Sequence, residues 1–122
     1  MWSKQLPSDA LPLTRNAGSA ELRIEATRLG RDLLVTLVGG DAHIGAVALA
    51  GSNQRADAPV LAVPDHRDDV IAKEAASKIA KEFNCNCVVI VGIHVSNASR
   101  RQINEIVNAS FSLVDELIEV LK

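Results

Sequence analysis

The spacing of apolar residues changes abruptly near the middle of the chain. In the first half, Leu22, Ile24 and Ala26 alternate with charged residues, which is the period of a β-strand with one wet face. From Arg67 to Phe83, apolar residues recur every three or four positions, which is the period of an amphipathic helix. Strands followed by helical segments are typical of a sheet with helices packed against it.

The remaining apolar runs complete this pattern. Short runs bounded by glycine or proline turns predict three more strands, at 33–38, 43–50 and 60–63. A nearly continuous apolar run, 87–91, predicts a strand in the centre of the sheet. A capping box at Ser99 opens a final helix with one apolar stripe. We therefore predict an α/β (α+β) fold, a largely antiparallel sheet of about five strands with two helices on one face, in the order β-β-β-β-α-β-α.

The domain organisation follows from length and composition. Residues 1–19 contain prolines and Gly18 without a sustained period, so we predict an extended N-terminal arm before a single domain over 20–122. With 122 residues the chain is long enough to bury a core without metals or disulfides. No apolar run approaches the roughly 20 residues of a membrane span, and the N-terminus lacks a secretion signal. We expect a cytoplasmic protein without membrane contact.

Charge and aromatic content argue against nucleic acid as a partner. The formal net charge is -2, so the chain lacks a basic field, and its aromatic residues are only Trp2, Phe83 and Phe111, so base stacking is poorly provided for. Two cysteines, Cys85 and Cys87, would face the same side of a strand and are interpreted as buried thiols. A zinc site would need two more ligands at suitable spacing, so we expect no cysteine metal site.

The three histidines of the chain are predicted to meet at one edge of the sheet. If 33–38 and 43–50 form a hairpin, His43 lies where the first of these strands finishes. Counting strand directions onward, the strands that precede His66 and His94 finish at the same edge. Both predicted helices begin there, and helix N-termini favour anions. The sequence therefore predicts a ligand site at this edge that suits a phosphate.

Other interpretations of the same residues remain open. Each histidine taken alone is also typical of a polar residue at the end of a strand or helix. A zinc site made by all three is conceivable, although ligands on three separate loops have no diagnostic spacing. Asp65, Asp68 and Asp69 are interpreted as acidic residues that favour the start of a helix. No serine lies in a G-x-S-x-G elbow, so we expect no catalytic residue.

Three segments carry a resemblance to a known family. They are His-Ile-Gly-Ala-Val-Ala at 43–48, Pro-Asp-His-Arg-Asp-Asp at 64–69 and Gly-Ile-His-Val-Ser-Asn-Ala at 92–98. In this order and spacing they resemble the LpdD-like family, small companion proteins (D subunits) of gallate-type decarboxylases. The resemblance covers about residues 20–122, and all three segments fall at the predicted edge.

The resemblance implies a non-enzymatic prenylated-flavin chaperone with a fold similar to proteasome assembly chaperones. Such a protein is a homodimer that binds reduced prenylated FMN as cargo and delivers it to the apoenzyme of a UbiD-family decarboxylase. Carried over by position, the cofactor-binding candidates are His43, His66, His94, Asn97, Ser99 and Gly40. Two alternatives stay open: an interaction or assembly scaffold without a small ligand, and, less favoured, a small histidine-dependent metalloenzyme.

Overall fold

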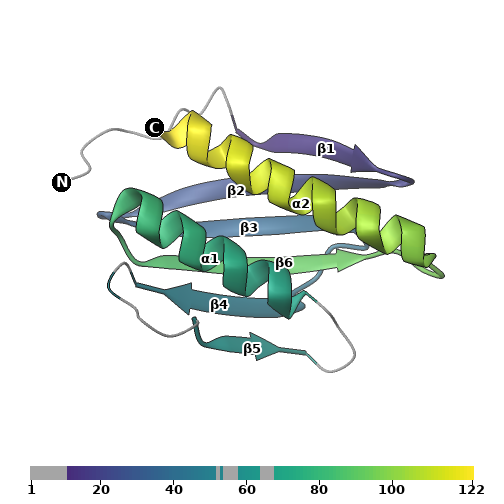
Figure 1. The fold of residues 1–122 in the computed structure, drawn as a ribbon, viewed down its shortest axis with the longest axis horizontal. Coiled ribbons are helices and arrows are strands. Elements are labelled where there is room, and N and C mark those ends of the chain that lie inside the picture. Colours follow the sequence, from purple (N-terminus) through teal and green to yellow (C-terminus); the bar gives the residue numbers. More distant parts are fainter. Residues whose placement is uncertain (1–10, 52, 54–57, 64–67) are drawn as a thin grey trace.

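The structure, a computed structural model, describes residues 11–51, 53, 58–63 and 68–122. These residues form six strands and two helices (Figure 1): β1 (Leu13–Ala17), β2 (Ala20–Leu29), β3 (Asp32–Gly40), β4 (Ala46–Ala50), β5 (Val60–Ala62), α1 (Asp69–Phe83), β6 (Cys87–His94) and α2 (Arg100–Leu121). The strands make one sheet in the order β1-β2-β3-β6-β4-β5. Both helices lie on the same face of it (Figure 1). The predicted α+β class is confirmed.

Strand β6 lies inside the sheet, as the sequence predicts. It runs parallel to β3 and antiparallel to β4, while the other neighbours in the sheet pair antiparallel. The hairpin expected between 33–38 and 43–50 is therefore wrong, because β6 is inserted between β3 and β4. A strand that is apolar on both faces gains most from neighbours on both sides, which also satisfy both rows of its backbone groups. The predicted strand directions are nevertheless unchanged.

Strand β1 is the element that the sequence analysis missed. Its residues belong to the predicted arm, but they pair antiparallel with β2 through a turn at Gly18, whose φ is +63°. Arg15 ties the strand to α2, where its guanidinium contacts Ser112 and lies 2.5 Å from the Glu116 carboxylate. Because these partners are distant in the chain, the sequence around Arg15 does not reveal the strand. The first ten residues of the predicted arm lie outside the described residues, and the limits of the domain remain a prediction.

The core lies between the sheet and the two helices. Helix α1 contributes three fully buried alanines, whose small side chains let it approach the sheet closely, at Ala72, Ala76 and Ala80. Helix α2 buries the stripe predicted from the sequence, including Leu113, Leu117 and Ile118. The sheet supplies branched residues from its central strands, such as Val35, Leu37 and Val89. Covering one face of the sheet in this way leaves its opposite face outside the core.

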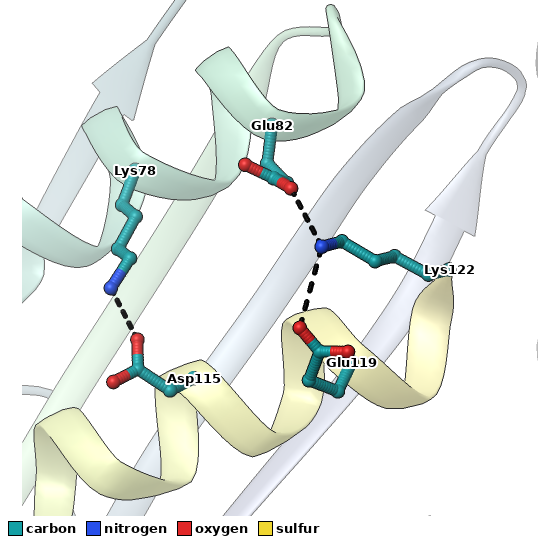
Figure 2. Close-up of polar contacts among 5 residues, drawn as sticks. All are labelled: Lys78, Glu82, Asp115, Glu119 and Lys122. Carbon is teal, nitrogen blue, oxygen red and sulfur yellow. Dashed lines mark hydrogen bonds and ion pairs between the residues drawn. The ribbon is translucent and has the colours of Figure 1, made fainter.

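The two helices are joined at their surface by ion pairs. Figure 2 shows Lys78 of α1 against Asp115 of α2, and Lys122 between Glu82 and Glu119 at 3.1 and 3.3 Å. These side chains are all 40% or more exposed, so solvent screens the pairs and their contribution to stability is small. The pairs set the alignment of the helices more than the stability of the fold.

The predicted capping box at the start of α2 is half formed. The Ser99 hydroxyl accepts a hydrogen bond from the Gln102 backbone N–H at 3.1 Å, as an N-cap should. The Gln102 side chain does not return to Ser99. Its amide donates instead to the Ser19 hydroxyl at 3.0 Å, which joins the turn between β1 and β2 to the helix. A residue expected to serve its own helix therefore holds two elements together.

Candidate functional site

The candidate site lies where β3 and β6 end, at the edge predicted from the sequence. The chain leaves β3 and must cross the end of β6 to reach β4. Two backbone hydrogen bonds hold this connection, from Asp41 N–H to the His94 carbonyl and from Gly45 N–H to the Val91 carbonyl, both at 2.9 Å. His43 is carried on the connection and His94 on the end of β6, so the topology itself brings them together.

Glycines leave the space for this crossing. A Cβ atom at Gly92 would lie 1.5 Å from the His43 carbonyl oxygen, so no other residue fits beneath the connection. A Cβ atom at Gly40 would lie 2.1 Å from the His94 carbonyl oxygen, and the φ of Gly40 is +61°, which favours glycine on its own. The close backbone approach expected near Gly40 is therefore made by the chain itself, at His94.

His43 is held on two sides. Its Nδ1 lies 3.0 Å from the Asp41 carbonyl oxygen, and because a carbonyl only accepts, Nδ1 donates this hydrogen bond. Its Nε2 lies 3.6 Å from a carboxylate oxygen of Asp68, which attracts the ring when the ring is protonated. The ring meets that of His94 edge to face, with centroids 6.3 Å apart and an interplanar angle of 82°. The imidazoles are thus adjacent.

Asp68 is the residue of this site whose place sequence reasoning missed. The sequence analysis interpreted it as an acidic residue at a helix start, and it is indeed the N-cap of α1. Its carboxylate, however, makes no cap hydrogen bond and is buried beside His43, with 8% of the side chain exposed. A Cβ atom at Gly45 would lie 2.0 Å from its Oδ2. Only this long-range contact distinguishes Asp68 from an ordinary helix cap.

A shallow hollow opens beside the two imidazoles. Its volume is about 350 Å³, and it is lined by Asp41, Ala42, His43 and His94. This is at the low end of the range for ligand sites, which enclose most of the surface of what they bind. Three of these lining residues lie on the connection between β3 and β4 and the fourth lies at the end of β6, so they enclose only one side of the hollow. The lining of the hollow is mostly apolar, and alone the hollow encloses little.

The other predicted site residues lie around this edge without joining the hollow. Asn97 adopts a left-handed conformation, with φ at 56°, in the connection that leads to α2. Ser99 caps α2 and lines a separate hollow of about 260 Å³ with Arg101 and the β1–β2 turn. His66 lies outside the described residues. The structure therefore brings together His43, His94 and the Gly40 backbone, and their role in binding remains a prediction.

Both helices begin at this end of the sheet (Figure 1), as the sequence predicts, but their first turns differ in charge. Helix α1 opens with Asp68 and Asp69, which already occupy the positive end of its dipole. Helix α2 has no acidic residue in its first turn and carries Arg100 and Arg101 there. An anion is therefore better accommodated at the start of α2.

The three-histidine metal alternative includes His66, which lies outside the described residues, so it stays a prediction. Among residues 11–51, 53, 58–63 and 68–122, no three metal-ligating side chains gather closely enough to hold an ion. Cys85 and Cys87 are buried free thiols near the opposite end of β6. Burial raises the pKa of Cys87 to about 12, so its sulfur stays protonated. Within the same part of the chain, neither helix has the length and apolar character of a membrane span.

Comparison with known proteins places this geometry in a family. No curated protein matches the chain. The crystal structure of a chaperone complex for yeast 20S proteasome assembly is similar in fold, with a TM-score of 0.59 over 91% of this chain and 97% of that chain, at 16% identity. The family model of the prenylated flavin chaperone LpdD-like domain matches residues 16–122. The chain, with its two histidines at the end of the central strand, therefore belongs to the LpdD-like prenylated flavin chaperone family.

Proposed function

We propose that this protein binds reduced prenylated FMN as cargo at the edge formed by His43 and His94, and delivers it to the apoenzyme of a UbiD-family decarboxylase. Membership of a prenylated flavin chaperone family supports the class of cargo. The observation that carries the placement is the meeting of two imidazole rings beside the hollow at the end of β6. In this proposal the protein is a carrier and not an enzyme.

The chemistry of the edge suits a flavin phosphate. The exposed imidazole of His94 can donate to or accept from the polar edge of a flavin, or donate to its phosphate, while the ring of His43 forms part of the wall beside it. The chain then runs from His94 to Ser99 within a few residues and opens helix α2, whose first turn has two arginines and no acidic residue. A phosphate near this turn meets free backbone N–H groups and positive charge.

The openness of the site fits delivery. A carrier must hold its cargo and later release it to an apoenzyme, so a site that fully enclosed the flavin would slow transfer. His94 is exposed at the end of β6, and the hollow faces solvent. The cargo would therefore stay accessible to the receiving decarboxylase while it is bound.

An anaerobic titration tests the proposal. Reduced prenylated FMN is added to the full chain and binding is followed by its fluorescence, with oxidised FMN as the matched ligand. We expect saturable binding of the reduced prenylated cofactor, weaker binding of oxidised FMN, and activation of an apo decarboxylase of the UbiD family by the loaded protein. Equal affinity for both ligands, or no binding of the reduced one, contradicts the carrier function.

The scaffold alternative has one observation in its favour. Large apolar side chains are exposed on the strands, including Leu61 at 80% and Leu49 at 51%. Isolated exposed apolar residues are common, but several on one face indicate a contact surface. A scaffold without a ligand and a carrier that forms a homodimer both fit this observation. The titration separates them, because only the carrier binds the flavin.

A further inference from the structure

The hollow at the end of β6 has a mostly apolar surface although polar residues line it. Of its four lining residues, Ala42 contributes a methyl group and is exposed on the connection between β3 and β4. The Asp41 N–H donates to the His94 carbonyl at 2.9 Å, and the Asp41 carbonyl accepts from His43 Nδ1 at 3.0 Å. These polar groups are already used within the protein. What the hollow presents to a ligand is therefore mainly carbon.

The ring of His43 adds to this apolar character. Its Nδ1 donates to the Asp41 carbonyl, and its Nε2 lies 3.6 Å from the buried Asp68 carboxylate, so both ring nitrogens face other parts of the protein. The hollow is thus lined by the carbon atoms of this ring. His94, by contrast, is exposed at the end of β6 and keeps a polar edge. An apolar wall therefore lies next to one hydrogen-bonding side chain.

The two imidazole rings form a corner and not a flat platform. Their planes stand at 82° with the centroids 6.3 Å apart, and both rings line the hollow. A flat ring system can lie parallel to only one of two perpendicular walls. A branched hydrocarbon has thickness in every direction, so it contacts both walls at once. The shape of the hollow favours a bulky aliphatic group over the plane of a flavin.

The volume of the hollow limits how much of a flavin nucleotide it can hold. Sites that enclose a drug-sized ligand have volumes of about 300 to 1,000 Å³. This hollow has about 350 Å³ and is open to solvent, so it takes only a part of such a ligand. The separate hollow at the start of α2, lined by Ser99 and Arg101, offers a guanidinium group and suits the phosphate.

We propose that the hollow at the end of β6 takes the isoprenoid group of the cargo, and that Ala42 is a residue that selects for this group. Prenylation adds a branched hydrocarbon to the flavin, and this hydrocarbon gains by leaving water for the Ala42 methyl group and the His43 ring. His94 then meets the polar edge of the flavin beside it. This placement rests on the proposed cargo function and deepens it, because it assigns which part of the cargo lies in the hollow.

Both ends of the cargo can be held at the same time. His94 and Ser99 are separated by a chain segment that spans at most about 17 Å. A flavin nucleotide carries its phosphate on a flexible ribityl chain, which adjusts to a separation of this order. With the isoprenoid group in the hollow, the phosphate reaches the first turn of α2, where Arg100 and Arg101 lie.

Titration with two reduced flavins tests this placement. Reduced prenylated FMN and reduced unprenylated FMN are added anaerobically to the full chain, and the ratio of their affinities measures the preference for the isoprenoid group. We expect the prenylated cofactor to bind about tenfold more tightly, since even one methylene in an apolar site discriminates by about this factor. Equal affinity for the two flavins overturns the placement and leaves the carrier function intact. Absence of binding by both overturns the proposed function and the placement with it.

Two substitutions of Ala42 separate polarity from size. Ala42→Asn puts an amide into the hollow and should lower the preference at least fivefold, because the isoprenoid group would cover a polar group without giving it a partner. Ala42→Leu has a similar shape but is apolar, so it should keep the preference. Ala42 is exposed, so both variants should fold, which circular dichroism checks. An unchanged preference in Ala42→Asn, or an equal loss in Ala42→Leu, overturns the assignment.

Arg101→Gln is the contrasting variant at the other end of the cargo. The Arg101 side chain is 91% exposed, and the phosphate that it would meet is common to both flavins. We expect both affinities to fall by the same factor, about threefold, with the preference unchanged. A loss of preference in Arg101→Gln but not in Ala42→Asn overturns the placement.

Nuclear Overhauser contacts give a direct readout of the bound cargo. We expect contacts between the isoprenoid methyl protons and both the Ala42 methyl group and the ring protons of His43. Contacts from these methyl protons to the first turn of α2, and none to Ala42, overturn the placement.

Discussion

The two ends of the central strand β6 both carry polar groups and a hollow, yet they differ in how those groups are used. At its start, the Asn86 backbone N–H donates to the Asp32 carboxylate at 2.9 Å, and the Leu33 N–H donates to the Asn86 carbonyl at 3.1 Å. At its end, the backbone groups are bonded in the same way, but two imidazole rings line the hollow. The backbone groups are hydrogen-bonded at both ends of β6, whereas imidazole side chains line the hollow only where the strand ends.

The hollows themselves do not tell the ends apart. The one at the start of β6 has a volume of about 290 Å³ and is lined by amides, Arg31, Asp32 and Cys85. The one at the end has about 350 Å³. In the first, the Asp32 carboxylate and the Asn86 side chain already hydrogen-bond to each other at 3.4 Å. The candidate site is therefore distinguished by the close approach of His43 to Gly92 and of His94 to Gly40, whereas the volumes of the two hollows are similar.

The largest expected effect concerns the connection that passes over Gly92 at the end of β6, which has no counterpart at the start of this strand. Gly92→Ala forces the connection away from β6, because its Cβ would lie 1.5 Å from the His43 carbonyl oxygen. We expect the free energy of unfolding in urea to fall by about 3 kcal/mol. The control at the other end is Gly51→Ala, whose Cβ would meet only the Asn86 side chain at 3.2 Å and should cost less than about 0.5 kcal/mol. Equal losses in the free energy of unfolding for the two variants would contradict the close packing of the connection against Gly92.

Substitution of the histidines should show that the cargo binds at the end of β6 and not at its start. His43→Asn and His94→Asn should each weaken the binding of reduced prenylated FMN by about tenfold or more, because the first removes a ring that lines the hollow and the second removes an exposed hydrogen-bonding ring. The sequence predicts the same result for His66→Asn. Asn53→Ala, in the hollow at the start of β6, should leave the affinity unchanged. Thermal melting serves as the check: a collapse of the melting temperature in the histidine variants would show that these side chains are structural.

Alkaline pH should weaken the start of β6. Burial, and then Cys85 and Asp32, raise the pKa of the Cys87 thiol from 9.0 to about 12. Below pH 9 the thiol is protonated in both states and the stability is fully present. As the pH rises from 9 towards 12, only the unfolded chain loses this proton, so stability falls by up to about 1.4 kcal/mol per pH unit. Urea unfolding at pH 8 and 10 measures the slope. Cys87→Ala should reduce the slope but not abolish it, because burial also raises the pKa of the Cys85 thiol, and an unchanged slope contradicts the assignment.

The smallest expected effect concerns the positioning of His43. Asp68→Asn keeps the shape of the side chain and removes no cap hydrogen bond, because the carboxylate makes none, so the free energy of unfolding should change by less than about 1 kcal/mol. The variant lacks the negative charge that attracts the protonated ring, so it should lower cargo affinity by about fivefold and shift the ring signals of His43 in nuclear magnetic resonance spectra. Asp69→Asn, one residue further, is the control. If both variants leave the His43 signals in place, Asp68 does not position the ring.

Much of the fold could be predicted because it is encoded locally. Alternation and helical spacing identified the strands from Leu22 onward and both helices, since each period follows from backbone geometry. Strand direction then followed from connection length, and this placed His43 and His94 at one edge although the assumed hairpin is wrong. The predicted strand directions stay correct because the insertion of β6 changes which strands are neighbours, but not the end of the sheet at which each strand finishes.

The elements that escaped prediction depend on distant partners. Strand β1 is short and polar on its outer side, and its Arg15 is held by α2 residues about a hundred positions away. Asp68 resembles any acidic residue at a helix start until the gap at Gly45 and the ring of His43 are known. Neither contact produces a period, a spacing or a composition that a single sequence displays.

By itself, then, the sequence determined both helices, the strands β2 to β6, the directions in which they run, and therefore the edge at which His43 and His94 meet, because these depend on periods and connections within a few residues. Tertiary structure alone decided that β6 separates β3 from β4, that Gly40, Gly45 and Gly92 make room for the crossing, and that one face of the sheet stays open. These features arise from packing between segments far apart in the chain, where the available space, and not the local pattern, selects the arrangement.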